Sequence, residues 1–157
     1  WENTSSTLAS GQRGTASSVF VSENDVYVAS TEFNGTVDVA TIWKNNVKTP
    51  LSANNQNNYA NSVYVSQGDV YVVGTEFNGS FKAKIWKNGI ESSLITTAEL
   101  TVANSVFVVE DDVYVVGFKV NSTTNKEVAT LWKNGVETPL TDGSQLSFAN
   151  SVFVVTN

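Results

Sequence analysis

The chain has 157 residues and a formal net charge of −6, and only 15% of its residues are charged. A chain of this length can bury a sizeable core, and its acidic balance argues against a nucleic-acid partner, which usually requires a basic surface. The sequence contains no cysteine and no histidine, which excludes disulfides, thiol chemistry, Ser-His-Asp catalysis and ordinary zinc sites within these residues. No apolar run approaches the roughly 20 residues of a membrane helix, so we expect no membrane insertion.

The first segment, residues 1–15, runs from Trp1 through a polar turn to Leu8 and then to Ala16. The same order of residue types recurs between Trp132 and Phe148. We therefore interpret residues 1–15 as the end of a repeated unit, beginning at the end of its third strand.

Three longer segments of closely similar sequence follow. They begin at Ala16 (ASSVFVSENDVYVAS), Ala60 (ANSVYVSQGDVYVVG) and Ala103 (ANSVFVVEDDVYVVG), and the opening of a fourth begins at Ala149. A period of roughly 44 residues is typical of repeat architectures. The chain thus divides into complete units at 16–59, 60–102 and 103–148, with partial units at 1–15 and 149–157.

Each complete unit contains four predicted strands. Two short runs of valine with phenylalanine or tyrosine are joined by a tight turn, a third strand ends at a tryptophan, and an Asn-Gly or Asn-Asn pair turns the chain into a short fourth strand. The predicted first strands are Ser18–Val21, Ser62–Val65 and Ser105–Val109, and Ser151–Val155 matches them. The predicted second strands are Asp25–Ala29, Asp69–Val73 and Asp112–Val116. The fourth strands end at Leu51, Leu94 and Leu140.

Four consecutive short antiparallel strands in a unit of this length resemble a β-propeller blade. The second strand, VYVVG in two units, is similar to the corresponding strand of a kelch-type blade, with the kelch double glycine replaced by Ala29-Ser30, Val73-Gly74 and Val116-Gly117. The resemblance covers essentially the whole chain and implies an all-β propeller. Propellers typically contain about four to eight blades, so further repeats or another chain would be needed to close the ring.

The best candidate binding element is the segment TEFNG, which occurs twice between the second and third strands. Its Phe33, Asn34, Phe77 and Asn78 place an aromatic ring beside an amide, a combination that can contact a sugar or a peptide. The asparagine-rich link at 53–58 is predicted to lie on the same rim. The alternative is that Glu-Phe-Asn-Gly forms a turn and packs its phenylalanine against the sheet.

Two other recurring residues have structural and functional interpretations. Trp43, Trp86 and Trp132 end the third strands, and we expect them to be buried between units; the alternative is a platform that stacks on sugar rings. An aspartate (Asp25, Asp69 and Asp112) begins each second strand and is expected to cap the turn; alternatively the three carboxylates line a central channel and collect cations. The sequence lacks a calcium-loop motif, and we expect no metal and no cofactor.

The leading hypothesis for function is a non-catalytic, extracellular or cell-surface propeller that acts as a binding or structural module for a protein or glycan ligand. Asn-x-Ser/Thr triplets at Asn3, Asn34, Asn78 and Asn121 fall in predicted loops and permit glycosylation there. One alternative is a lectin-like propeller with a shallow sugar site on each blade. The other is a propeller enzyme whose active site lies outside these residues.

Overall fold

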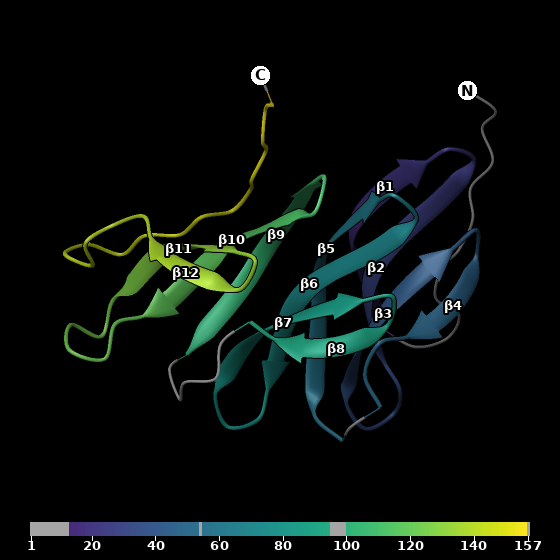
Figure 1. Cartoon of the computed structure of the whole chain (residues 1–157). Coiled ribbons are helices and arrows are strands. Elements are labelled where there is room, and N and C mark those ends of the chain that lie inside the picture. Colours follow the sequence, from purple (N-terminus) through teal and green to yellow (C-terminus); the bar gives the residue numbers. More distant parts are fainter. Residues whose placement is uncertain (1–12, 54, 95–99, 157) are drawn as a thin grey trace.

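A computed structural model describes residues 13–53, 55–94 and 100–156 of the chain. The described residues form twelve β-strands and no helix, arranged as three four-stranded antiparallel sheets (Figure 1). The first sheet contains β1 (Gly14–Ser22), β2 (Asp25–Phe33), β3 (Asp38–Lys44) and β4 (Val47–Pro50). The second contains β5 (Asn57–Ser66), β6 (Asp69–Phe77), β7 (Phe81–Lys87) and β8 (Ile90–Ser93). The third contains β9 (Thr101–Val109), β10 (Asp112–Val120), β11 (Glu127–Lys133) and β12 (Val136–Pro139).

Within each sheet the strands are neighbours in the order in which the chain visits them. Tight turns make this possible, because both residues of the pairs Asn88-Gly89 and Asn134-Gly135 have positive φ. That backbone conformation matches the twist of the strands on either side of a two-residue hairpin. Between the first and second strands the positive φ falls on Glu23, Gln67 and Glu110.

The all-β class and the predicted four strands in each complete unit are confirmed. The first two strands of each sheet are longer than predicted, because backbone pairing continues beyond the valine-rich runs; in the first sheet it extends to Gly14, which pairs with Glu32. The segment Ser151–Val155, predicted as the first strand of a further partial unit, forms no backbone ladder with another described segment. The prediction for residues 1–15 lies almost wholly outside the described residues.

The core lies between successive sheets. Trp86, on β7, is fully buried in a cluster with Tyr27, Ala29 and Leu51 of the first sheet. Trp132, on β11, is fully buried in the equivalent cluster with second-sheet residues. Each of these tryptophans thus packs on the sheet that precedes its own, which confirms the expectation that they are buried between units. Trp43 is only half-buried, because no described sheet precedes the first one.

The first strands of successive sheets meet at three similar junctions. The first joins β1 to β5, the second joins β5 to β9, and the third joins β9 to the C-terminal segment at 149–156. At each junction a serine hydroxyl accepts a hydrogen bond from a valine N–H of the following segment: Ser18 from Val63 (3.3 Å), Ser62 from Val106 (3.3 Å) and Ser105 from Val152 (3.4 Å). The C-terminal segment therefore takes the position relative to β9 that β9 takes relative to β5.

A row of aromatic rings crosses the same junctions. The centroids of Phe20 and Tyr64 are 4.6 Å apart, those of Tyr64 and Phe107 are 4.7 Å apart, and those of Phe107 and Phe153 are 5.0 Å apart. These separations are typical of favourable ring contacts. The sheets lie side by side in chain order and, within the described residues, do not close into a ring (Figure 1).

Candidate functional site

The aspartate that begins each second strand belongs to a side-chain cluster at one end of its sheet, which we call the turn cluster. In the first sheet, Asp25 accepts a hydrogen bond from Asn45 Nδ2 at 2.6 Å. It also forms an ion pair with Lys44 Nζ at 2.7 Å. The Asn45 side-chain oxygen accepts from the N–H of Val26 at 2.9 Å, and the Lys44 ammonium lies 5.3 Å from the Tyr27 ring centroid. The cluster therefore ties the start of β2 to the turn after β3.

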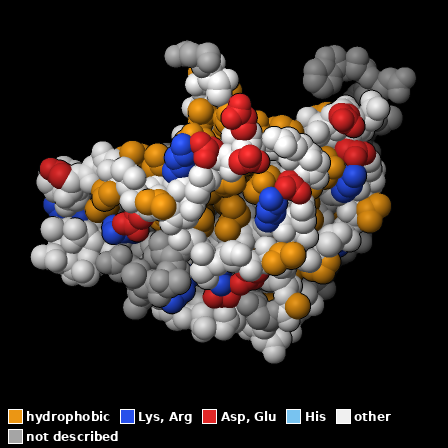
Figure 2. Space-filling model, viewed as in Figure 1, with side chains coloured by type: hydrophobic (Ala, Val, Ile, Leu, Met, Phe, Trp, Pro, Cys, Tyr) orange, Lys and Arg blue, Asp and Glu red, His pale blue; other side chains and the backbone are white. Residues whose placement is uncertain are grey.

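The same contacts recur in the other two sheets. Asp69 accepts from Asn88 Nδ2 at 2.8 Å and pairs with Lys87 at 2.7 Å, while Asp112 accepts from Asn134 Nδ2 at 2.7 Å and pairs with Lys133 at 2.6 Å. Blue and red side chains accordingly lie next to one another along the viewed face in Figure 2. Because each carboxylate is occupied by a lysine and an asparagine, the geometry favours turn capping over cation collection.

Hydrogen bonds in the turn clusters shift the titration of these groups. The bond from Lys44, followed by that from Asn45, lowers the pKa of Asp25 below its ordinary value, and the equivalent partners lower the pKa of Asp69 and Asp112. The bond to Asp25 likewise raises the pKa of Lys44. Both partners thus remain charged across the neutral range, as a structural cross-link requires.

A second set of charged residues lies on the strands next to the tryptophans, and in the first two sheets it accepts a hydrogen bond from the indole N–H. In the first sheet, Trp43 Nε1 donates to Glu32 at 2.8 Å and to Ser30 at 3.0 Å, and Glu32 pairs with Lys48. In the second sheet, Trp86 Nε1 donates to Glu91 at 3.3 Å, and Glu91 pairs with Lys84 at 2.7 Å. In the third sheet the two charges have exchanged strands relative to the first sheet. The second strand, β10, carries the cation Lys119, and it pairs with Glu137 on the fourth strand, β12. There the buried Trp132 Nε1 has no hydrogen-bond partner.

The predicted binding residues of the first unit lie where β2 ends and its loop begins. Phe33 is the last residue of β2, and the Arg13 guanidinium lies 4.7 Å from its ring centroid. Asn34 is exposed, and its side-chain oxygen accepts from the N–H groups of Thr36 at 2.9 Å and Val37 at 3.0 Å. These bonds hold the turn, so Asn34 has a structural role whether or not it also binds a ligand.

In the second unit the predicted residues are more accessible. Phe77 ends β6 and Phe81 begins β7; each is 38% exposed, and their ring centroids are 4.8 Å apart. Asn78, next to Phe77, is also exposed. The structure thus places an accessible aromatic pair beside an amide at the rim. Binding by Phe33, Asn34, Phe77 and Asn78 stays a prediction.

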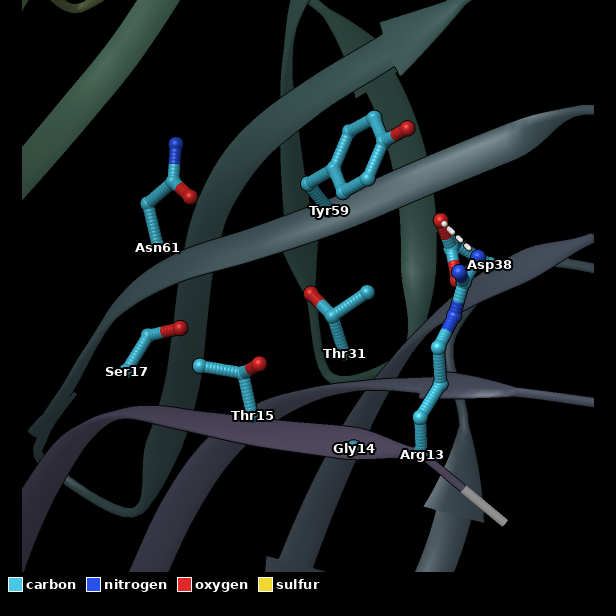
Figure 3. A pocket seen from close by; sticks show the side chains of 8 residues that line it. All are labelled: Arg13, Gly14, Thr15, Ser17, Thr31, Asp38, Tyr59 and Asn61. Carbon is cyan, nitrogen blue, oxygen red and sulfur yellow. Dashed lines mark hydrogen bonds and ion pairs between the residues drawn. The ribbon is translucent and has the colours of Figure 1, made fainter.

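A cavity of about 380 Å³, lined mostly by residues with polar side chains, opens at the first junction, near the same end of the sheets. It was not predicted from the sequence. In Figure 3, Thr15 and Ser17 on β1 lie across the cavity from Tyr59 and Asn61 on β5, with the Arg13–Asp38 ion pair at one end. Arg13 Nη2 contacts the two Asp38 oxygens at 3.0 and 3.2 Å. Burial, followed by the charge of Asp38, raises the pKa of Tyr59, whose phenol therefore stays protonated at neutral pH.

At its bulge β1 has a smaller residue than the other two first strands, and this difference lies beside the cavity. Each first strand contains a bulge, and the residue at the bulge is directed toward the next sheet. Asn61 at the bulge of β5 donates to Ala103 O at 2.8 Å, and Asn104 at the bulge of β9 donates to Ala149 O at 3.0 Å. At the bulge of β1 the residue is Ser17, and the described residues contain no matching bond from it to Ala60.

A neighbouring position on β1 also carries a smaller residue than its counterpart on β5. Thr15 on β1 corresponds to the larger Tyr59 on β5. The backbone differs as well: a Cβ added at Gly74 on β6 would lie 1.8 Å from Tyr59 O, so β5 can approach β6 closely only because that residue is glycine. The first sheet has Ser30 at that position, and Ser30 pairs with Ala16 in the register in which Gly74 pairs with Ala60. The sequence feature that could have indicated the cavity is Ser17, because the other two bulge residues are asparagine.

Comparison with known proteins gave no assignment: no family model matches the chain, and no curated protein matches it. Among the described residues, no helix is long and apolar enough to cross a membrane. The same residues contain no group of three or more acidic side chains placed to hold a metal ion.

Proposed function

We propose that the three sheets are consecutive kelch-like blades of a β-propeller, and that this propeller is a non-catalytic binding or structural module outside the cell. The observation that supports the architecture is the repetition of one junction three times. The serine-to-valine hydrogen bond and the aromatic contact recur at the third junction, where the C-terminal segment stands in for the first strand of a further blade. Constant contacts of this kind are expected from units placed around a common axis.

Residues at the rim of the sheets, where β3 and β7 begin, support a binding role. Catalytic groups need environments that differ from one another, whereas the turn clusters repeat with every sheet and neutralise their own charges. The aromatic pair Phe77 and Phe81 is accessible, and neighbouring Asn78 supplies an amide. Loops at the end of a rigid all-β scaffold commonly carry binding residues.

A crystal structure of the protein tests the architecture. We expect successive sheets to be related by a constant rotation about one axis, with the aromatic row nearest that axis. Sheets related mainly by translation along a straight line would contradict the propeller.

The binding role is tested by immobilised arrays of extracellular proteins and glycans probed with the chain. The double variant Phe33→Ala/Phe77→Ala should lose the retained ligand. Ile90→Ala is the matched control, because Ile90 is an exposed apolar residue at the opposite end of the sheet, beyond β7. Unchanged retention by the double variant would show that the predicted rim residues do not bind.

A further inference from the structure

We propose that the cavity at the first junction binds a neutral saccharide, holding one pyranose ring between β1 and β5. This inference rests on the proposed function as a binding module and specifies the class of its ligand. The cavity of about 380 Å³ lies at the small end of the range for ligand sites in proteins and suits a monosaccharide or the terminal residue of a glycan.

The lining of the cavity matches the chemistry of a sugar. Thr15, Ser17 and Tyr59 present hydroxyl groups, each of which can both donate and accept a hydrogen bond. The Thr31 hydroxyl already accepts from the N–H of Ala60 at 3.1 Å and can still donate, whereas the amide nitrogen of Asn61 is bonded to Ala103 O. A pyranose carries hydroxyl groups of the same dual character around its ring. Hydroxyl groups from three strands can therefore pair with several sugar hydroxyls at once, which fixes the orientation of the ring.

The charge in the cavity favours a neutral ligand. Arg13 is the cation that lines it, and both oxygens of Asp38 already contact its guanidinium. The backbone N–H of Asp38 in turn donates to Asn57 at 2.9 Å, which holds this end of the cavity to β5. An anionic ligand would have to compete with the Asp38 carboxylate for Arg13, whereas a neutral hydroxyl can bond to the intact pair.

The repeated architecture provides an internal comparison. At the second junction the bulge amide of Asn61 reaches the carbonyl of Ala103, and Tyr59 takes the position that corresponds to Thr15. Replacing Ser17 by asparagine should therefore reproduce an arrangement that the fold already accommodates. The substitution would place an amide in the cavity and direct it toward Ala60 O, without removing a buried group.

The experiment uses saturation-transfer NMR and isothermal titration calorimetry on the 157-residue chain. The probes are the methyl glycosides of glucose, galactose, mannose and N-acetylglucosamine, and glucuronate is the anionic comparison. We expect at least one neutral glycoside to bind the unmodified chain and glucuronate to bind more weakly. Ser17→Asn should weaken the neutral interaction by about tenfold or more while leaving the melting temperature unchanged or higher.

Asn104→Ser is the matched control, because it makes the reverse exchange at the bulge of β9, at the third junction and away from the cavity. It should leave glycoside affinity unchanged. The inference is overturned if none of the neutral glycosides binds the unmodified chain, if binding persists in folded Ser17→Asn, or if glucuronate binds best. If the arrays yield a protein ligand and no glycoside binds, the inference of a saccharide site is overturned, whereas the proposed function as a binding module is retained.

Discussion

At the scale of single residues, the three tryptophans occupy equivalent sequence positions but have different surroundings. Trp86 is fully buried against the first sheet, whereas Trp43 is half-buried. Truncating a buried aromatic residue removes its transfer free energy and leaves a cavity. Trp86→Ala should therefore lower the free energy of unfolding by about 3–5 kcal/mol, and Trp43→Ala by clearly less. Urea denaturation followed by circular dichroism measures both, and equal losses would contradict packing between sheets as the cause.

The aspartates of the turn clusters predict a dependence of stability on pH. Their folded-state pKa values are lowered, so their contribution is fully present above the unfolded value of about 4 and is lost as the pH falls through the folded values. The urea midpoint should fall between about pH 5 and pH 2. Asp25→Asn/Asp69→Asn/Asp112→Asn should make this dependence shallower, and added salt should do the same because these groups are exposed. An unchanged slope in the triple variant would assign the acid sensitivity to other groups.

At the scale of single strands, the third sheet contains a correctable defect. Trp132 Nε1 is buried without a partner, whereas the indole of Trp43 donates to Glu32, which pairs with Lys48. Exchanging the third-sheet pair, as Lys119→Glu/Glu137→Lys, would place a carboxylate at the position of Glu32. Because an unsatisfied buried donor costs about 1–3 kcal/mol, the double variant should unfold at a higher urea concentration.

The two single variants are the controls for that exchange. Lys119→Glu alone places two carboxylates together, and Glu137→Lys alone places two ammonium groups together, so each should destabilise the protein. A double variant no more stable than the better single variant would show that Trp132 does not gain an acceptor.

How much of each sheet could be predicted depended on which residues carried the pattern. Valine runs located the hairpin between the first and second strands, and Asn-Gly or Asn-Asn pairs located the one between the third and fourth, because hydrophobic alternation and positive φ are local properties. The pairing of Gly14 with Glu32 was missed because no apolar residue marks it. The cavity beside Ser17 was missed because the significance of that residue depends on the bulge, which directs it across to another sheet. The repeat showed that Ser17 differs from its counterparts, but the sequence did not reveal in which direction its side chain points.

At the scale of the whole molecule, apolar side chains are exposed at both ends of the row of sheets. The equivalent valine side chains of the second sheet are buried. Val19 and Val21 are 64% and 60% exposed, whereas the equivalent Val63 and Val65 are 3% and 6% exposed. Phe153 and Val155 are exposed beyond the third sheet. Open apolar faces of this kind promote association, so the isolated 157-residue chain should self-associate as its concentration rises.

Light scattering over a concentration series measures this association. Val19→Lys/Val21→Lys should shift the population toward the single-chain mass, and Val47→Lys, which alters an exposed valine at a hairpin turn of the same sheet, is the control. A stable species of single-chain mass with sharp two-state melting at all concentrations would contradict the prediction.

The near-identity of the three junctions also has a consequence for how the chain reaches its native state. Each junction uses the same serine-to-valine bond and a similar ring contact, so the surface that the first sheet presents to the second is also complementary to the third. These shared contacts therefore do not encode the order of the sheets; the bulge residues distinguish the junctions only in part, because Asn61 and Asn104 make the same bond and Ser17 does not. During refolding the third sheet can dock on the first and leave the second looped out. Chain connectivity then contributes most to selecting the native order, and escape from such a misdocked intermediate requires a buried junction to reopen.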